Sequence, residues 1–133
     1  MKFNHLIPEL SVSNIEKSKY FYCNVLGFEL TYERVNDNFA FLTYQKAQIM
    51  IEEINDNWNV GQLIRPFGRG VNFQIQTNEI DNISKKLKEN HIEIFKDIFE
   101  SEYAVKDRLY LEKELLVQDP DGYLLRFQQT LKK

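Results

Sequence analysis

Hydrophobic and polar side chains alternate along residues 4–12, which places Leu6, Pro8, Leu10 and Val12 on one face. This two-residue period predicts a strand. Ser13 and Glu16 follow with the spacing of a capping box, which predicts the start of a helix. Side chains at helical spacing then form one face, at Ile15, Ser18, Tyr22 and Val25. Gly27 predicts the end of this helix, because glycine readily adopts the left-handed conformation found there.

Three runs typical of strands come next, at 28–35, 39–44 and 48–54. The cluster Asn36-Asp37-Asn38 between the first two predicts a turn. Residues 55–70 contain Asn, Asp, Pro and Gly without a regular period, and we interpret them as a linker.

The same order then recurs. A strand is predicted at 71–77, a second capping box at 78–81, and a helix whose buried face holds Ile80, Ile83 and Leu87. Further strands are predicted at 92–95, 110–118 and 123–129, with a turn at 119–122 joining the last two. A shift of 65 residues superposes the strand and helix of the first half on those of the second. The chain is therefore predicted to be a tandem repeat of a βαβββ unit, with the units at 4–54 and 71–129.

Composition narrows the class of protein. A chain of 133 residues predicts a single domain over 1–133. The net charge of −3 disfavours nucleic-acid binding, and no apolar run is long enough to span a membrane. The single cysteine, Cys23, has no partner for a disulfide, and neither it nor His91 has the neighbours of a catalytic group. These features predict a cytoplasmic globular protein.

The ordered set of motifs resembles the vicinal oxygen chelate superfamily, which includes glyoxalase I, extradiol dioxygenases, fosfomycin-resistance transferases and bleomycin-resistance proteins. The resemblance rests on Phe21-Tyr22 and Leu26-Gly27-Phe28 in the first half and Asp119-Pro120-Asp121-Gly122-Tyr123 in the second. It implies an α+β fold in which tandem βαβββ units form a curved, half-barrel sheet cleft. Binding or chemistry takes place in that cleft.

The enzymes of this superfamily hold a divalent metal with four side chains, and the resemblance assigns these positions to Ile7, Met50, Asn72 and Arg126. Ile has no lone pair, Met is a poor ligand for such cations, and Arg carries the wrong charge. We therefore expect no metal, no cofactor and no catalytic residue. A shift of two residues leaves an alternative metal site open, formed by His5, Glu9 and Glu52.

Within the superfamily, the chain most resembles the bleomycin-resistance proteins. Residues 7–12 resemble their Ile-Pro-x-Leu-x-Val strand, residues 36–40 their acidic turn followed by Phe-Ala, and residues 113–115 their Arg-acid-Phe run. The resemblance implies a homodimer that confers antibiotic resistance by sequestering a planar aromatic ligand in clefts at its interface. Whether such a dimer is side-by-side or strand-exchanged stays open.

The resemblance also implies the ligand-binding residues. Phe39 matches the stacking phenylalanine, and Tyr110 stands near the position of a stacking tryptophan. Trp58 and Tyr103 are expected in loops beside the cleft. The remaining predicted lining residues are Ile7, Glu9, Met50, Glu52, Asn72 and Arg126. Arg126 either pairs with Glu9 or Glu52 across the cleft or binds an anionic group of the ligand.

These expectations predict a metal-free small-molecule binding protein, with bleomycin-type antibiotics as candidate ligands. Two alternatives remain at this point. One is a metal-dependent lyase, isomerase or transferase of the same superfamily. The other is a ligand-sensing regulatory domain that uses the same cleft.

Overall fold

The computed structural model describes residues 1–132, with the side chains of residues 1–131. It divides into two compact units, residues 1–67 (unit 1) and the part from Gly68 onward (unit 2). The boundary falls within the predicted linker, while the extent of a single domain over 1–133 stays a prediction. Of the helices that the structure describes, none has the length and hydropathy of a transmembrane span.

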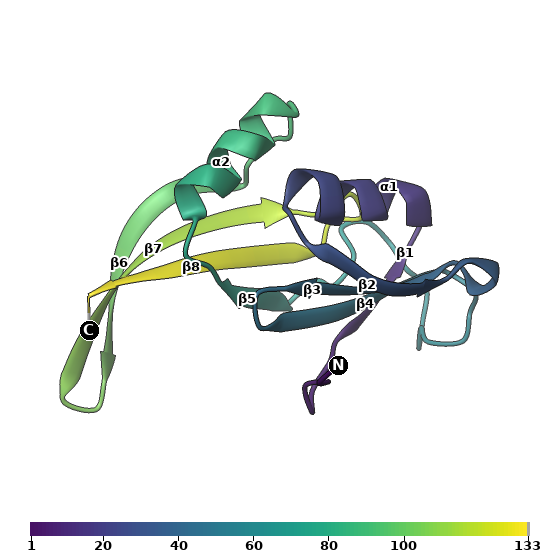
Figure 1. The fold of residues 1–133 in the computed structure, drawn as a ribbon, viewed down its shortest axis with the longest axis horizontal. Coiled ribbons are helices and arrows are strands. Elements are labelled where there is room, and N and C mark those ends of the chain that lie inside the picture. The colour runs from purple at the N-terminus through teal and green to yellow at the C-terminus, as the bar shows by residue number, and fades with distance from the viewer. Residues whose placement is uncertain (133) are drawn as a thin grey trace. The chain divides into compact units, whose positions relative to one another are not determined.

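Unit 1 begins with a strand and a helix and ends with three strands (Figure 1). Its elements are β1 (Glu9–Val12), α1 (Ile15–Lys19), the π-helical turn η1 (Tyr20–Val25), β2 (Glu29–Arg34), the 3-10 turn η2 (Val35–Asp37), β3 (Phe39–Tyr44) and β4 (Ala47–Glu53). The strands form one sheet in the order β1-β4-β3-β2, with β1 parallel to β4.

Unit 2 repeats this order. Its elements are β5 (Asn72–Gln76), α2 (Ile80–Glu89), β6 (Lys96–Val105), β7 (Arg108–Gln118) and β8 (Leu124–Lys132). The sheet order is β5-β8-β7-β6, and β5 is parallel to β8. The α+β class and the tandem βαβββ order predicted from the sequence are therefore confirmed, as two open four-stranded sheets.

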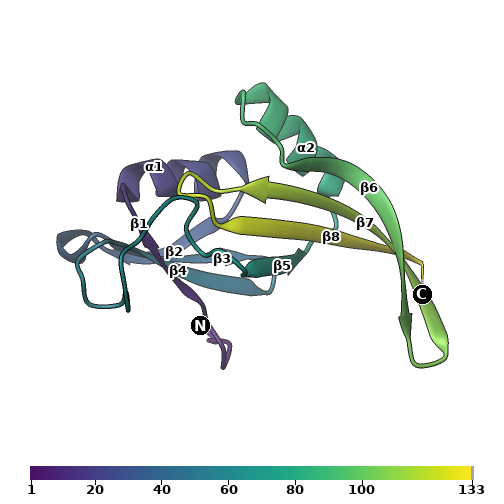
Figure 2. The same cartoon turned by 180° about the vertical axis from the view of Figure 1, so that it is seen from behind.

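In each unit a helix covers one face of the sheet, with α1 over the first sheet and α2 over the second (Figure 2). The predicted helix faces are buried, because they pack on the apolar side of the sheet. The core of unit 1 includes Val12, Ile15, Tyr22, Leu42 and Ile51, and that of unit 2 includes Ile80, Leu87, Leu115, Leu125 and Phe127. The opposite face of each sheet is free of helix and carries mainly polar and aromatic side chains.

Both predicted capping boxes are wrong. The first helix is capped by Asn14, whose Oδ1 accepts a hydrogen bond of 3.0 Å from the Lys17 amide. The second has Glu79 at its N-cap and no side-chain cap. Each helix start also has an acceptor from the last strand of its unit. Glu53 Oε1 accepts from the Ile15 amide at 3.0 Å, and Gln129 Oε1 accepts from the Ile80 amide at 2.9 Å.

The largest differences from the predicted strands lie in β1 and β6. β1 begins at Glu9 instead of residue 4. The strand predicted at 92–95 is absent, and β6 occupies Lys96–Val105, a stretch in which the sequence predicted loop. β6 forms an edge of its sheet and is exposed along much of its length, so it lacks the apolar alternation that marks a half-buried strand. Together with β7 it forms a hairpin that extends beyond the end of β8 (Figure 1).

Candidate functional site

The candidate site in unit 1 lies on the sheet face opposite α1. Strand register places Glu9, Met50 and Phe41 side by side in one row across this face. The next row contains Phe39 beside Glu52. Four of the predicted site residues, Glu9, Phe39, Met50 and Glu52, therefore share one surface of the sheet, as expected.

Aromatic rings fill the part of this face over β2 and β3. The Tyr32 and Phe41 rings are stacked with centroids 5.1 Å apart. Phe39 is only 2% exposed, and the Arg34 guanidinium lies 3.9 Å above its ring centre. Phe39 is thus covered by neighbours from β2 in this structure. Its role in stacking a ligand stays a prediction that requires the Arg34 side chain to move.

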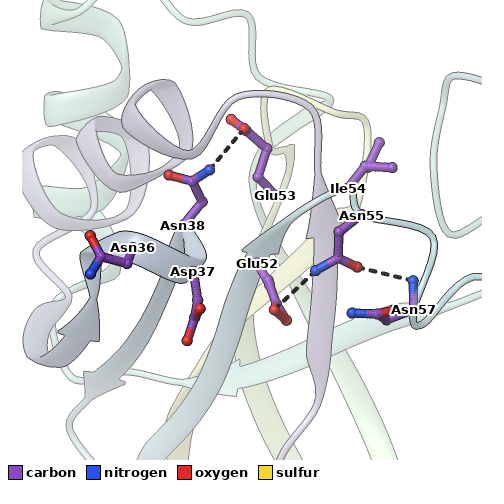
Figure 3. Close-up of a pocket in the computed structure, with 8 residues that line it drawn as sticks. All are labelled: Asn36, Asp37, Asn38, Glu52, Glu53, Ile54, Asn55 and Asn57. Atoms are coloured by element: carbon purple, nitrogen blue, oxygen red, sulfur yellow. Dashed lines mark hydrogen bonds between the residues drawn. The ribbon is translucent and has the colours of Figure 1, made fainter.

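A polar pocket of about 480 Å³ opens at the end of β4 (Figure 3). It is lined by Asn36, Asp37, Asn38, Glu52, Glu53, Ile54, Asn55 and Asn57. Figure 3 shows the Asp37 and Glu52 carboxylates pointing to one side, whereas Glu53 points the other way, toward Asn38. Glu53 also accepts from the first amide of α1, so its charge stabilises the helix N-terminus. The remaining carboxylates of the pocket are Glu52 and Asp37, of which Asp37 is paired with Arg34.

Glu52 holds the only tryptophan of the chain in place. Trp58 Nε1 donates to Glu52 Oε1 at 3.0 Å, and Asn55 Nδ2 donates to Oε2 at 3.2 Å. The Trp58 side chain is nevertheless 63% exposed. An indole fixed at its nitrogen with its ring in solvent can accept a planar partner without first losing many conformations. The prediction that Trp58 lies in a loop is confirmed.

The acidic side chains on this face are only partly balanced by the guanidinium of Arg34. Burial and the neighbouring Glu52 carboxylate raise the pKa of Glu9, and Arg34 opposes this shift only in part. Arg34 also lies 3.4 Å from Asp37, measured from Nε to Oδ2. The surface around Glu9 and Glu52 therefore favours a cationic group over an anionic one.

The helix-free face of unit 2 carries a connected polar network. Arg126 forms an ion pair with Glu114, with 3.1 Å between Nε and Oε1. Arg126 also donates to Gln74, which in turn donates to Gln128 at 2.6 Å. Arg126 thus has a carboxylate partner in its own sheet, whereas the sequence analysis considered Glu9, Glu52 or an anionic group of the ligand. Asn72, at the start of β5, is exposed on the same face.

Two predicted aromatic residues meet on the hairpin of unit 2. Tyr103 and Tyr110 are directly paired across β6 and β7. The prediction that Tyr103 lies in a loop is wrong, because β6 extends through it. Its hydroxyl donates to Glu114, which also accepts from Ser101 Oγ at 2.5 Å. A pocket of about 490 Å³ lies beside the pair, lined by Gln74, Tyr103, Ala104, Val105, Tyr110, Glu112, Arg126 and Gln128.

The four positions that the resemblance assigns to metal ligands do not fit a divalent cation. Ile7 and Met50 in unit 1 offer no hard donor, and in unit 2 Arg126 is a cation already engaged with Glu114. The alternative of His5, Glu9 and Glu52 is not assembled either. His5 is exposed in a bend before β1, and within the described part of the chain no three His, Cys, Asp or Glu side chains converge as metal ligands do.

Two residues of these faces were missed in the sequence. Arg34 follows the exposed part of β2 and looks like an ordinary surface cation, yet it covers Phe39. Glu112 lies two positions before Glu114 and two after Tyr110, so all three point to one face of β7. On the other face of this strand Leu111, Leu115 and Val117 are apolar and Lys113 is the exception. That alternation of polar and mostly apolar residues was the signal available in the sequence.

The protein contains two four-stranded sheets of equivalent strand order. Each sheet has one helix-covered face and one polar, aromatic face. This is the arrangement of a tandem βαβββ protein. The sequence profile of the Glyoxalase/Bleomycin resistance protein/Dioxygenase superfamily matches residues 2–127. The chain belongs to this superfamily.

Relatives with described roles are also found. The chain is 30% identical over 135 residues to a bleomycin resistance protein from Geobacillus stearothermophilus, covering 95% of this chain and 96% of the relative. A bleomycin resistance protein from Staphylococcus aureus matches to the same extent. Among solved structures, TioX from Micromonospora sp. ML1 superposes with a TM-score of 0.74 at 15% identity, covering 97% of this chain and all of that chain. This last likeness shows the fold alone.

Proposed function

We propose that this protein binds a planar, cationic small molecule of the bleomycin type and sequesters it without changing it chemically. One observation carries the proposal. An exposed indole, Trp58, is held by the Glu52 carboxylate at the edge of an acidic pocket. A flat ring system can stack on the indole while a positive group enters the pocket beside Asp37 and Glu52. The bleomycin resistance proteins that share 30% identity with the chain support this ligand class.

Affinity requires more than one contact. An aromatic stack contributes about 0.5–1.5 kcal/mol beyond the surface it buries. Micromolar binding needs roughly 8 kcal/mol in total. In unit 1, Phe39 is a candidate for a second stacking contact once the Arg34 guanidinium moves from its ring. Unit 2 offers candidate contacts of its own, the rings of Tyr103 and Tyr110, with Asn72 and Arg126 to orient polar groups.

Sequestration explains the residues better than metal-dependent chemistry does. The positions expected to bind a metal hold side chains that do not fit one, and Cys23 is not an activated nucleophile, since burial raises the pKa of its thiol. We infer that the protein acts as a metal-free homodimer in the cytoplasm and thereby confers antibiotic resistance. Light scattering after size exclusion tests the dimer, and metal analysis of protein purified without a chelator tests the metal.

Isothermal titration with bleomycin tests the ligand. We expect micromolar affinity, with a change in the fluorescence of the single tryptophan. Glu52→Gln should weaken binding about tenfold, because the pocket loses a charge and Trp58 loses a charge-assisted partner. Glu29→Gln is the matched control, since it removes one exposed carboxylate from β2 outside this pocket and should change affinity less than twofold. No heat and no fluorescence change at high micromolar bleomycin would refute this ligand.

A further inference from the structure

The carboxylate of Glu112 is buried beside the pocket of unit 2, and one of its two oxygens has no hydrogen-bond partner among the residues that the structure describes. Glu112 is 5% exposed. Its Oε1 accepts from Thr130 Oγ1 at 3.2 Å, and Thr130 accepts from Gln76 Nε2 at 3.1 Å. Its Oε2 is buried and has no hydrogen-bond partner among the residues that the structure describes. A buried carboxylate oxygen without a partner is costly, so this atom is suited to a ligand that supplies one.

The basic residue that lines this pocket is already in use. Arg126 is paired with Glu114 through Nε and donates to Gln74 through its terminal nitrogen. Glu114 also has one buried oxygen without a hydrogen bond, Oε1, but Arg126 Nε lies 3.1 Å from it as an ion-pair partner, and its Oε2 accepts from Ser101 and Tyr103. The side chains that line the pocket thus leave Glu112 without a cation, while Glu114 two residues along the strand has one.

The rest of the pocket suits a flat nitrogen cation. Tyr103 and Tyr110 flank it as cross-strand neighbours and present aromatic rings, and Gln128 adds an amide. Its volume of about 490 Å³ is enough for a group of the size of an aryl amidine. Aromatic faces attract cations, and a carboxylate accepts a strong hydrogen bond from an ammonium or amidinium N–H.

We propose that Glu112, with Tyr103 and Tyr110, forms a subsite that accepts a protonated nitrogen group of the ligand through the free Oε2. This inference rests on the proposed function, because it specifies a chemical group that the sequestered molecule carries. The subsite should bind a cation more tightly than a neutral molecule of the same shape. A neutral molecule would leave the charge of the buried carboxylate uncompensated.

Benzamidine and benzamide are the probes, because they share their shape and differ in charge. Benzamidine should bind the wild-type protein in isothermal titration, and benzamide should bind at least tenfold more weakly. Glu112→Gln should weaken benzamidine binding about tenfold or more. Glu102→Gln is the matched control: it removes one exposed carboxylate from the same hairpin and should change affinity less than twofold. Equal binding of benzamidine to wild type and Glu112→Gln would overturn the subsite, as would equal binding of the two probes.

A second measurement does not depend on how the variant folds. In wild-type protein, the amide chemical shifts perturbed by benzamidine should centre on residues 110–112 and Gln128. Perturbations confined to other surfaces would overturn the proposal.

The affinity for bleomycin distinguishes a failure of the subsite from a failure of the proposed function. Equal bleomycin affinity in wild type and Glu112→Gln would refute the subsite and leave the function intact. If bleomycin fails to bind wild type while benzamidine binding still depends on Glu112, the proposed ligand is wrong and the subsite stands.

Discussion

The two units share one backbone plan and differ in what fills equivalent positions. A shift of 65 residues places Glu9 on Gln74, and the strand registers then pair Met50 with Arg126 and Phe39 with Glu114. In unit 1 the central position is a buried aromatic ring beneath a guanidinium. In unit 2 it is a carboxylate that is 1% exposed, held by a guanidinium and two hydroxyls.

This difference shows that the fold does not fix the chemistry of the helix-free face. The helix-covered faces are apolar in both units and supply the core. The other faces are stabilised in two ways, by aromatic packing in unit 1 and by a hydrogen-bonded ionic network in unit 2. Substitutions can disrupt the aromatic packing and the ionic network separately. The resulting changes in stability should differ in size and in their dependence on salt and pH.

The largest effect is expected from Phe39→Ala. Removing a buried phenylalanine leaves a cavity and should lower the free energy of unfolding by about 3–5 kcal/mol. The loss should be the same at low and high salt, because it comes from packing. Urea denaturation measures it, with Val35→Ala, at an exposed position of the neighbouring turn, as a control that should change stability by less than about 0.5 kcal/mol. A loss below about 1 kcal/mol would mean that Phe39 is not a packed part of unit 1.

Glu114→Gln should cost somewhat less, about 2–3 kcal/mol, because it leaves Arg126 without its carboxylate and weakens the bonds from Ser101 and Tyr103. Glu112→Gln provides the contrast within the same strand. It removes a buried charge whose pocket holds one cation, Arg126, which is already paired with Glu114, so stability should be unchanged or higher. The same urea measurement compares the two. Equal losses would contradict the difference in partners that the structure shows.

The smallest effect concerns Glu9, whose equivalent in unit 2 is the neutral Gln74. Burial and Glu52 raise the pKa of Glu9, so the folded protein binds its proton more tightly than the unfolded chain does. Ionisation of this carboxyl therefore costs stability as pH rises through its titration. Glu9→Gln should raise the melting temperature slightly at pH 7, and the gain should disappear below about pH 4, where the carboxyl is protonated in both states. A gain that grows toward low pH would contradict the direction of the pKa shift.

Most of the fold could be predicted from periodicity. β3 spans the predicted residues 39–44, and the buried face of α2 is the predicted one. The wrong predictions lie where residues far away in the sequence determine the local structure. Glu53 and Gln129 supply acceptors that local capping boxes were expected to supply, and no local pattern shows them. β6 was missed because an edge strand that is mostly exposed carries charges where a central strand carries apolar residues.

The candidate site could be predicted in outline only. The resemblance to the superfamily placed Glu9, Met50 and Glu52 along one cleft, and the strand registers put them on one face of the sheet. The partners of Arg126 and the covering of Phe39 by Arg34 depend on register and side-chain direction between strands, which a single sequence does not specify. The unused oxygen of Glu112 is a property of the assembled network and has no signature in the sequence.

The acceptors at the two helix starts also bear on synthesis, because each lies far along the chain from the helix that it serves. Each helix receives an acceptor for its first amide from the last strand of its unit, Glu53 for α1 and Gln129 for α2. α1 has five residues, too few to persist alone in water. During synthesis on the ribosome, each helix lacks this acceptor until the last strand of its unit has emerged. Unit 1 reaches this stage 76 residues before unit 2, at Glu53 against Gln129. The first unit therefore has the opportunity to fold while the second is still being translated.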